Sequence, residues 1–134
     1  ADNSGKLFLY TRNAGTWNPS LAITKDGRGL SQFTAKAWVN FDGTGTPSIR
    51  DSHNVSSFDD LGTGQYEANL TNNLANANYS VSAVSGDYDD TNSSFDYAVF
   101  GSRKFLVGSY RFQIINTGGD ARDTNAICLQ FFGD

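Results

Sequence analysis

The stretch from Ala37 to Tyr66 constrains the fold most, because segments of alternating side chains are separated there by glycine-rich turns. In a β-strand successive side chains point to opposite faces, so a period of two identifies a half-buried strand. The first segment has this period, with one face formed by Ala37, Val39 and Phe41 and the other by Trp38 and Asn40. We therefore expect a strand here whose first face lies in the core.

The turns in this stretch indicate an antiparallel meander. Asp42-Gly43-Thr44-Gly45 follows the first strand, and Asp-Gly supplies the positive φ angles of a tight hairpin. The segment Asp59–Gly64 predicts a second turn, after which alternation resumes at Tyr66. Because the apolar parity changes between Val55 and Phe58, we expect a β-bulge or bend between them. The pattern predicts three successive strands.

Composition extends this expectation to the whole chain. Methionine is absent and Glu67 is the single glutamate, whereas Gly, Asn, Ser and Thr are abundant, which disfavours helices. We expect an all-β fold, an antiparallel, jelly-roll-like β-sandwich of about eight or nine short strands. The 134 residues suffice for one core, so residues 1–134 are expected to form a single domain, with residues 1–10 as a connecting or assembly arm.

Charge and cysteine content exclude several classes of protein. The formal charge is −4 and the ten basic residues are scattered, which disfavours nucleic acid as a partner. We see no apolar run near the length of about 20 residues that crosses a bilayer, so membrane insertion is not expected. Cys128 is the sole cysteine and lies in an apolar segment, so an internal disulfide is excluded and we expect a buried thiol.

The residue types of a hydrolase triad occur together once, at Asp51-Ser52-His53. Neighbouring side chains of a strand point to opposite faces, so Ser52 and His53 cannot form the required hydrogen bond within an extended segment. Carboxylate pairs for glycoside hydrolysis would come from Asp59 with Asp60, or from Glu67, but a turn position does not suit such a pair. We expect no enzymatic activity and no cofactor.

Metal binding is considered for the acidic segment Asp87–Ser94, which carries three carboxylates with a fourth at Asp96. Calcium prefers clustered oxygen ligands, but this segment lacks the ordered spacing of a calcium loop, which favours a solvated loop. One histidine and one cysteine cannot form a zinc site within one chain. The sequence predicts no metal site.

The run from Ala35 to Val81 resembles a module of phage tail-fibre and related virion proteins. The motifs that carry this resemblance are the W-V-N-F strand, the G-T-G-T turn, the I-R-x-S-x-N-V-S-S segment and the G-T-G-x-Y strand, in this order. Its flanks extend the similarity to roughly Ile23–Gly133. The resemblance implies a location at the exposed end of a homotrimeric virion appendage, in contact with other virion proteins.

We predict two ligand-binding segments. Pro19 restricts Asn18 to an extended conformation, so Trp17 is expected in a surface loop, either packed over it or free to stack on a sugar ring. Tyr88 and Asp89 lie in the acidic segment, whose composition is typical of a loop that makes variable contacts. The predicted ligand is a host receptor, in particular a cell-surface polysaccharide.

Subunit contacts are predicted for four aromatic residues. The segment Phe95–Phe100 is apolar on both faces, so it is expected to be central in a sheet or to meet a neighbouring subunit. The predicted interface residues are Phe95, Tyr97, Phe100 and Phe132. Two functions follow: a host-attachment module of a phage appendage, or an assembly, decoration or capping protein that binds only other virion subunits.

Overall fold

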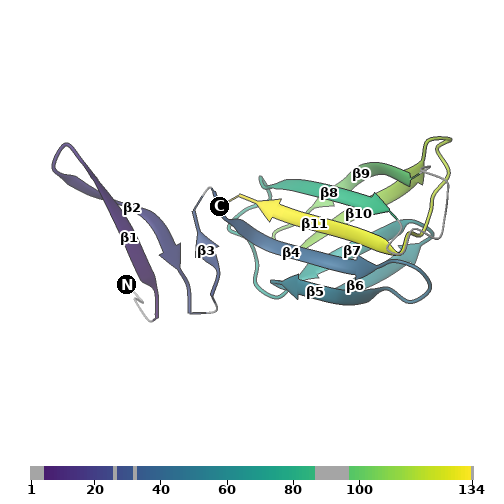
Figure 1. Cartoon of the computed structure of the whole chain (residues 1–134), viewed down its shortest axis with the longest axis horizontal. Helices are drawn as coiled ribbons and strands as arrows, with labels where there is room; N and C mark the ends of the chain where they lie inside the picture. Colours follow the sequence, from purple (N-terminus) through teal and green to yellow (C-terminus); the bar gives the residue numbers. More distant parts are fainter. Residues whose placement is uncertain (1–4, 26, 32, 87–96, 134) are drawn as a thin grey trace.

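The computed structural model describes residues 5–25, 27–31, 33–86 and 97–133, and in this part of the chain it contains eleven β-strands and no helix. All strand pairs within the three sheets are antiparallel, so the expected all-β antiparallel fold is confirmed. Eight of these strands form a sandwich of two sheets, and the other three form a smaller N-terminal sheet beyond one end of it (Figure 1).

The N-terminal sheet has the order β1-β2-β3. Its strands are β1 (Leu7–Asn13), β2 (Thr16–Ile23) and β3 (Gly29–Leu30). Ala14 and Gly15 join the first two strands with φ angles of 47° and 87°, the pair of positive values that a type I′ hairpin turn requires. Strand structure therefore begins inside the expected arm of residues 1–10 and continues to Leu30 before the sandwich starts.

The sandwich consists of two four-stranded sheets packed face to face (Figure 1). The first sheet has the order β5-β4-β11-β8, formed by Ser48–His53, Ala35–Asp42, Ala126–Phe132 and Ser80–Gly86. The second has the order β6-β7-β10-β9, formed by Val55–Gly62, Gln65–Leu70, Ser109–Asn116 and Tyr97–Phe105. Strands β5 and β6 are each an edge of their sheet, and they are consecutive in the chain.

The central stretch forms four strands rather than the expected three. Asn54 has a φ of 59°, a left-handed conformation that asparagine tolerates, and there the chain leaves β5 in one sheet to enter β6 in the other. The expected irregularity is confirmed as a register shift between Val55 and Ser57. The second turn is shorter than predicted, because β6 continues through Asp59 and Asp60 to Gly62.

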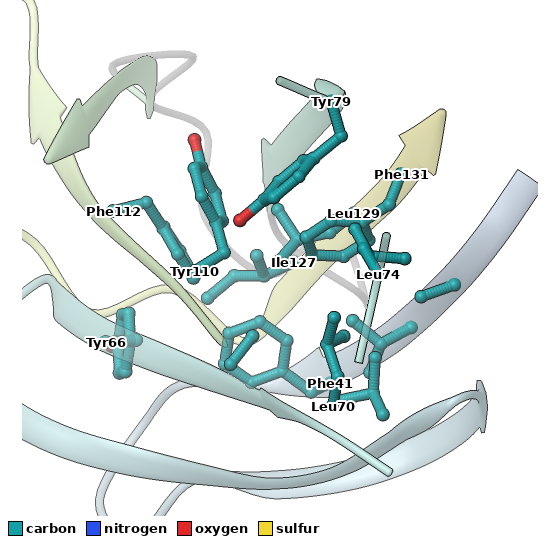
Figure 2. Close-up of a cluster of buried hydrophobic side chains, with 14 of the residues drawn as sticks. Phe41, Tyr66, Leu70, Leu74, Tyr79, Tyr110, Phe112, Ile127, Leu129 and Phe131 are labelled. Carbon is teal, nitrogen blue, oxygen red and sulfur yellow. The ribbon is translucent and has the colours of Figure 1, made fainter. Parts of the chain in front are cut away.

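The core is one cluster between the two sheets, and every member lies between Ala37 and Phe131. The predicted inward face of β4 is confirmed, since Ala37, Val39 and Phe41 are buried. Figure 2 shows how the aromatic and aliphatic side chains of both sheets meet, including Tyr66 and Phe112. Phe41 contacts the ring of Tyr66 edge-on at a centroid distance of 5.5 Å. Burial of such side chains is the main stabilising term, at about 25 cal/mol per Å² of apolar surface.

Two residues differ from expectation in their placement. Strand β9, which contains Tyr97 and Phe100, is the edge of its sheet and is not central as one alternative predicted. Cys128 is only partly buried, because Ile127 and Leu129 occupy the core face of β11 and leave Cys128 on the outer face. The prediction of a buried thiol was therefore wrong.

Candidate functional site

Trp38 lies on the outer face of the first sheet. Its neighbours Ala37 and Val39 point into the core, so the indole of Trp38 points away from it and is 36 % exposed. In the register of the sheet, Trp38 stands opposite His53 on β5 and Gln130 on β11. Opposed residues of antiparallel strands share a face, so an indole ring, an imidazole and an amide stand in one row.

A second row of side chains adjoins the first on this outer face. Asn40 stands opposite Asp51 on β5 and Cys128 on β11. The Asp51 carboxylate accepts a hydrogen bond of 2.8 Å from the Ser52 backbone N–H, which fixes its orientation. Asn40 Oδ1 is buried and makes no hydrogen bond with the described residues. We call Trp38, Asn40, Asp51, His53 and Gln130 the Trp38 face.

A small pocket of about 190 Å³ opens beside this face. Its lining includes His53, which links it to the Trp38 row, and its other lining residues are Arg28, Asn54, Thr71 and Asn72. Asn54 is held firmly, because its Nδ2 donates to the carbonyls of Lys36 and Asn72, both at 3.1 Å. Its Oδ1 accepts from the backbone N–H of Asn72 at 2.8 Å. The pocket wall is therefore preorganised.

A larger pocket, of about 370 Å³, lies where the N-terminal sheet joins the sandwich. It is lined by Arg28, Leu30, Ser31, Lys36, Asn73, Leu74 and Ala75. Lys36 is 2 % exposed, and its ammonium donates to the carbonyls of Ser31 and Thr34. A buried ammonium requires such partners, so Lys36 stabilises the chain between β3 and β4. These contacts assign Lys36 a structural role in the joint.

The opposite outer face, on the second sheet, carries Glu67. Ser109 Oγ donates to Glu67 Oε1 and Arg111 Nε donates to Oε2, both at 2.6 Å. The hydrogen bond from Ser109 is the largest cause of a lowered pKa for Glu67, which Arg111 lowers further while burial opposes both. A general acid for glycoside hydrolysis needs a raised pKa, so this environment does not suit Glu67 to that role.

The Asp51-Ser52-His53 segment lies within β5. Its neighbouring side chains therefore point to opposite faces of the sheet, which excludes a local triad. Ser52 Oγ donates to the Val55 carbonyl at 3.1 Å, away from His53. Asp59 and Asp60, considered as a carboxylate pair, lie in β6 and are exposed. Asp59 accepts from Asn69 Nδ2 at 3.2 Å, and Asp60 accepts from the Gly62 backbone N–H at 2.9 Å.

Of the three sequence-predicted ligand residues, Trp17 is the one that lies among the described residues. Trp17 lies in β2 and not in a loop, which corrects that prediction, and it is 63 % exposed. The guanidinium of Arg12 lies over its ring at 5.7 Å from the centroid. Tyr88 and Asp89 lie outside the described residues.

The predicted interface residues have a mixed placement. Phe95 lies outside the described residues, and Tyr97 and Phe100 are placed only by their backbone in β9. Phe132 ends β11, partly buried, opposite Ser80 and Ala35. Sequence reasoning did not single out Trp38 as a binding residue. The signal was present in its alternation with Ala37 and Val39, which assigns the indole to the outer face.

Comparison with known proteins found no matching family model, no curated protein with significant similarity and no solved structure with significant similarity. Among the described residues, no group of three or more His, Cys, Asp or Glu side chains is placed to hold a metal ion. In the same residues, no helix has the length and apolar character needed to cross a membrane.

Proposed function

We propose that this chain is a non-enzymatic module of a phage tail fibre or related virion appendage, which attaches the particle to a saccharide on the host surface. The module acts as a homotrimer together with other virion proteins. Support for the appendage comes from the resemblance of residues 35–81 to tail-fibre modules. The observation that carries the binding role is the exposed indole of Trp38 in a row with His53 and Gln130.

The Trp38 face suits a sugar ring for physical reasons. An indole offers a flat apolar surface, which can cover the C–H side of a pyranose, while the neighbouring imidazole, amide and carboxylate can hydrogen-bond its hydroxyl groups. These side chains project from paired strands, so little conformational entropy is lost on binding. A single shallow site of this kind binds weakly, and three copies in one appendage increase the avidity.

The proposal is tested by pulldown of the full chain on bacterial cells and on purified envelope polysaccharides. Trp38→Ala removes the stacking surface and is expected to weaken binding about tenfold, which corresponds to about 1.4 kcal/mol of lost contact. The Trp17→Ala/Tyr88→Ala double variant measures the contribution of the two segments predicted from sequence. If Trp38→Ala keeps the wild-type mass and fold and still binds unchanged, the Trp38 face is not the site.

The alternative function is assembly, decoration or capping, with contacts only to other virion subunits. The observation that favours it is the N-terminal sheet, where Leu7, Leu9, Tyr10 and Trp17 are all more than half exposed. This alternative predicts no affinity for host cells or their polysaccharides. Electron microscopy of the virion distinguishes the two, because attachment requires the module at an exposed tip.

A further inference from the structure

The N-terminal sheet has apolar side chains on both of its faces. Leu7 stands opposite Ile23 and Leu9 opposite Leu21, so these four side chains share one face, which we call the Leu7 face. The alternate residues form the other face: Phe8 stands opposite Ala22, which in turn stands opposite Leu30. A strand that is apolar on both faces is typical of a sheet that is covered on both sides.

Nothing in the described part of the chain covers the Leu7 face fully. Leu7 is 58 % and Leu9 53 % exposed, and the core cluster of the sandwich begins only at Ala37. Strand β1 is also an edge strand, paired on one side only. A two-residue third strand adds little to a hairpin that would be marginally stable alone. An exposed apolar face of this kind marks a protein–protein contact.

The distribution of charge along the chain indicates which surface covers the Leu7 face. Residues 1–34 contain four of the ten basic residues and two of the fourteen acidic residues, for a formal charge of +2. Residues 35–134 have a formal charge of −6. Two N-terminal sheets facing each other would repel, whereas an N-terminal sheet facing a sandwich would be attracted. The complementary surface is therefore the sandwich of another copy.

The sandwich has an acidic side at its β5 and β6 edges. Asp51 on β5 and Asp59 and Asp60 on β6 are exposed, and none of the three forms an ion pair among the described residues. Leu61 lies beside them and is 44 % exposed, so the side also offers apolar surface. Both strands are edges of their sheets, which leaves backbone groups available to a neighbouring chain.

We infer that the Leu7 face of one copy packs against the β5–β6 edge of a second copy, which brings Lys6 and Lys25 near the exposed carboxylates of Asp59 and Asp60 along that edge. The two lysines lie at one end of the N-terminal sheet, because Leu7 pairs with Ile23 and a Cβ at Gly5 would lie 3.1 Å from Lys25 Cβ. The contact joins two different surfaces, so its repetition gives a ring of copies when the rotation between neighbours closes, as a homotrimer requires. Asp51 belongs both to the β5–β6 edge and to the Trp38 face, so the contact adjoins the proposed saccharide site. The inference itself rests on the Leu7 face and on charge, and not on the ligand that the sandwich binds.

The test is the mass of the full chain in solution, measured by size-exclusion chromatography with light scattering. Wild type is expected to have two or more times the mass of one chain. Leu7→Glu/Leu9→Glu is expected to give monomers, whereas Val84→Glu on β8 is the matched control and keeps the wild-type mass. Val84 is a comparably exposed aliphatic residue, at 59 %, on a strand outside the inferred contact. Circular dichroism verifies that each variant remains a β-sheet protein.

A charge-reversal pair tests the partner surface. Lys6→Glu/Lys25→Glu and Asp59→Lys/Asp60→Lys are each expected to dissociate the assembly, and mixing the two variants is expected to restore it at low salt. A monomeric wild type, or a Leu7→Glu/Leu9→Glu protein that stays assembled, overturns the inference. If assembly requires Leu7 and Leu9 but is unchanged by both charge reversals, the β5–β6 edge is not the partner surface. Saccharide binding is measured separately. A monomeric wild type would also contradict the homotrimer of the proposed function, whereas loss of the inferred contact in a protein that still binds saccharide would leave the binding role standing.

Discussion

Tyr66 on β7 and Asp123 in the segment before β11 are joined by a hydrogen bond of 2.7 Å from Oη to Oδ1. The same Oδ1 accepts from the Gly64 backbone N–H at 2.6 Å, and Tyr66 Oη also lies 2.8 Å from the Gly43 carbonyl. Burial, and then Asp123, raise the pKa of Tyr66, so the phenol stays protonated and keeps its donor. One tyrosine thus connects both glycine turns of the central stretch to the last strand.

Tyr66→Phe is expected to destabilise the fold by about 1–3 kcal/mol, because it removes the one hydroxyl proton that the buried Gly43 carbonyl and the Asp123 carboxylate share. Urea unfolding followed by circular dichroism measures the change. Tyr10→Phe is the control, since Tyr10 is exposed and belongs to the N-terminal sheet, and a change within about 0.5 kcal/mol is expected. Equal effects of the two substitutions would contradict the role given to the Tyr66 hydroxyl.

Alanine substitutions at Gly64 and Gly45 distinguish the stability cost of close packing from the cost of backbone strain. Their φ angles are nearly equal, at 65° and 62°, so an alanine meets similar backbone strain of about 1–2 kcal/mol at either site. A Cβ at Gly64 would lie 2.5 Å from the Ile114 carbonyl oxygen, whereas a Cβ at Gly45 has open space. Gly64→Ala is therefore expected to lose about 1–3 kcal/mol more than Gly45→Ala in thermal or urea unfolding. Equal losses of stability in the two variants would show that the residues around Gly64 accommodate a Cβ without a free-energy cost.

Glu67 is expected to make stability depend on pH in the acidic range. Hydrogen bonds from Ser109 and Arg111 lower its pKa in the folded protein below the ordinary value of 4.5. The stabilisation is therefore present above pH 4.5 and is lost as the pH falls through the lowered folded value. Glu67→Gln is expected to cost about 1–3 kcal/mol at neutral pH, with a difference from wild type that shrinks in acid.

Urea unfolding across the acidic range measures this dependence. Asp59→Asn is the control, because Asp59 is an exposed carboxylate on the neighbouring strand and stands opposite Glu67. At a protein concentration low enough for the chain to be monomeric, it is expected to change stability by about 0.5 kcal/mol or less. If the difference in free energy of unfolding between wild type and Glu67→Gln stays constant down to the lowest pH, a lowered pKa of Glu67 in the folded state is not its origin.

The fold was predictable where a local pattern determined it. Alternation assigned the core face of β4, and the glycine turns predicted the hairpins around it. The sheet change at Asn54 was not predictable, because one left-handed residue separates two strands that read as one segment. Trp17 was placed in a loop on account of Pro19. Proline is tolerated there because β3 pairs only with Ala22 and Ile23, which leaves one side of β2 without a ladder at Pro19.

The candidate site was less accessible to sequence reasoning. Trp38 could be assigned to an outer face, but its neighbours His53 and Gln130 lie far apart in the chain, and only strand register brings them into one row. The exposure of the Leu7 face was likewise not predictable, since an apolar hairpin has the sequence pattern of a core element whether or not another surface covers it. Tyr88, Asp89 and Phe95 stay predictions.

The chain has two tryptophans, Trp17 and Trp38, so a proton–nitrogen NMR spectrum contains two indole N–H signals, which a Trp17→Phe variant assigns. Titration with envelope oligosaccharides from bound cells tests whether saccharide binds at the Trp38 face. We expect the Trp38 signal to shift with increasing saccharide. A saccharide that binds and leaves the Trp38 signal unmoved would contradict this expectation.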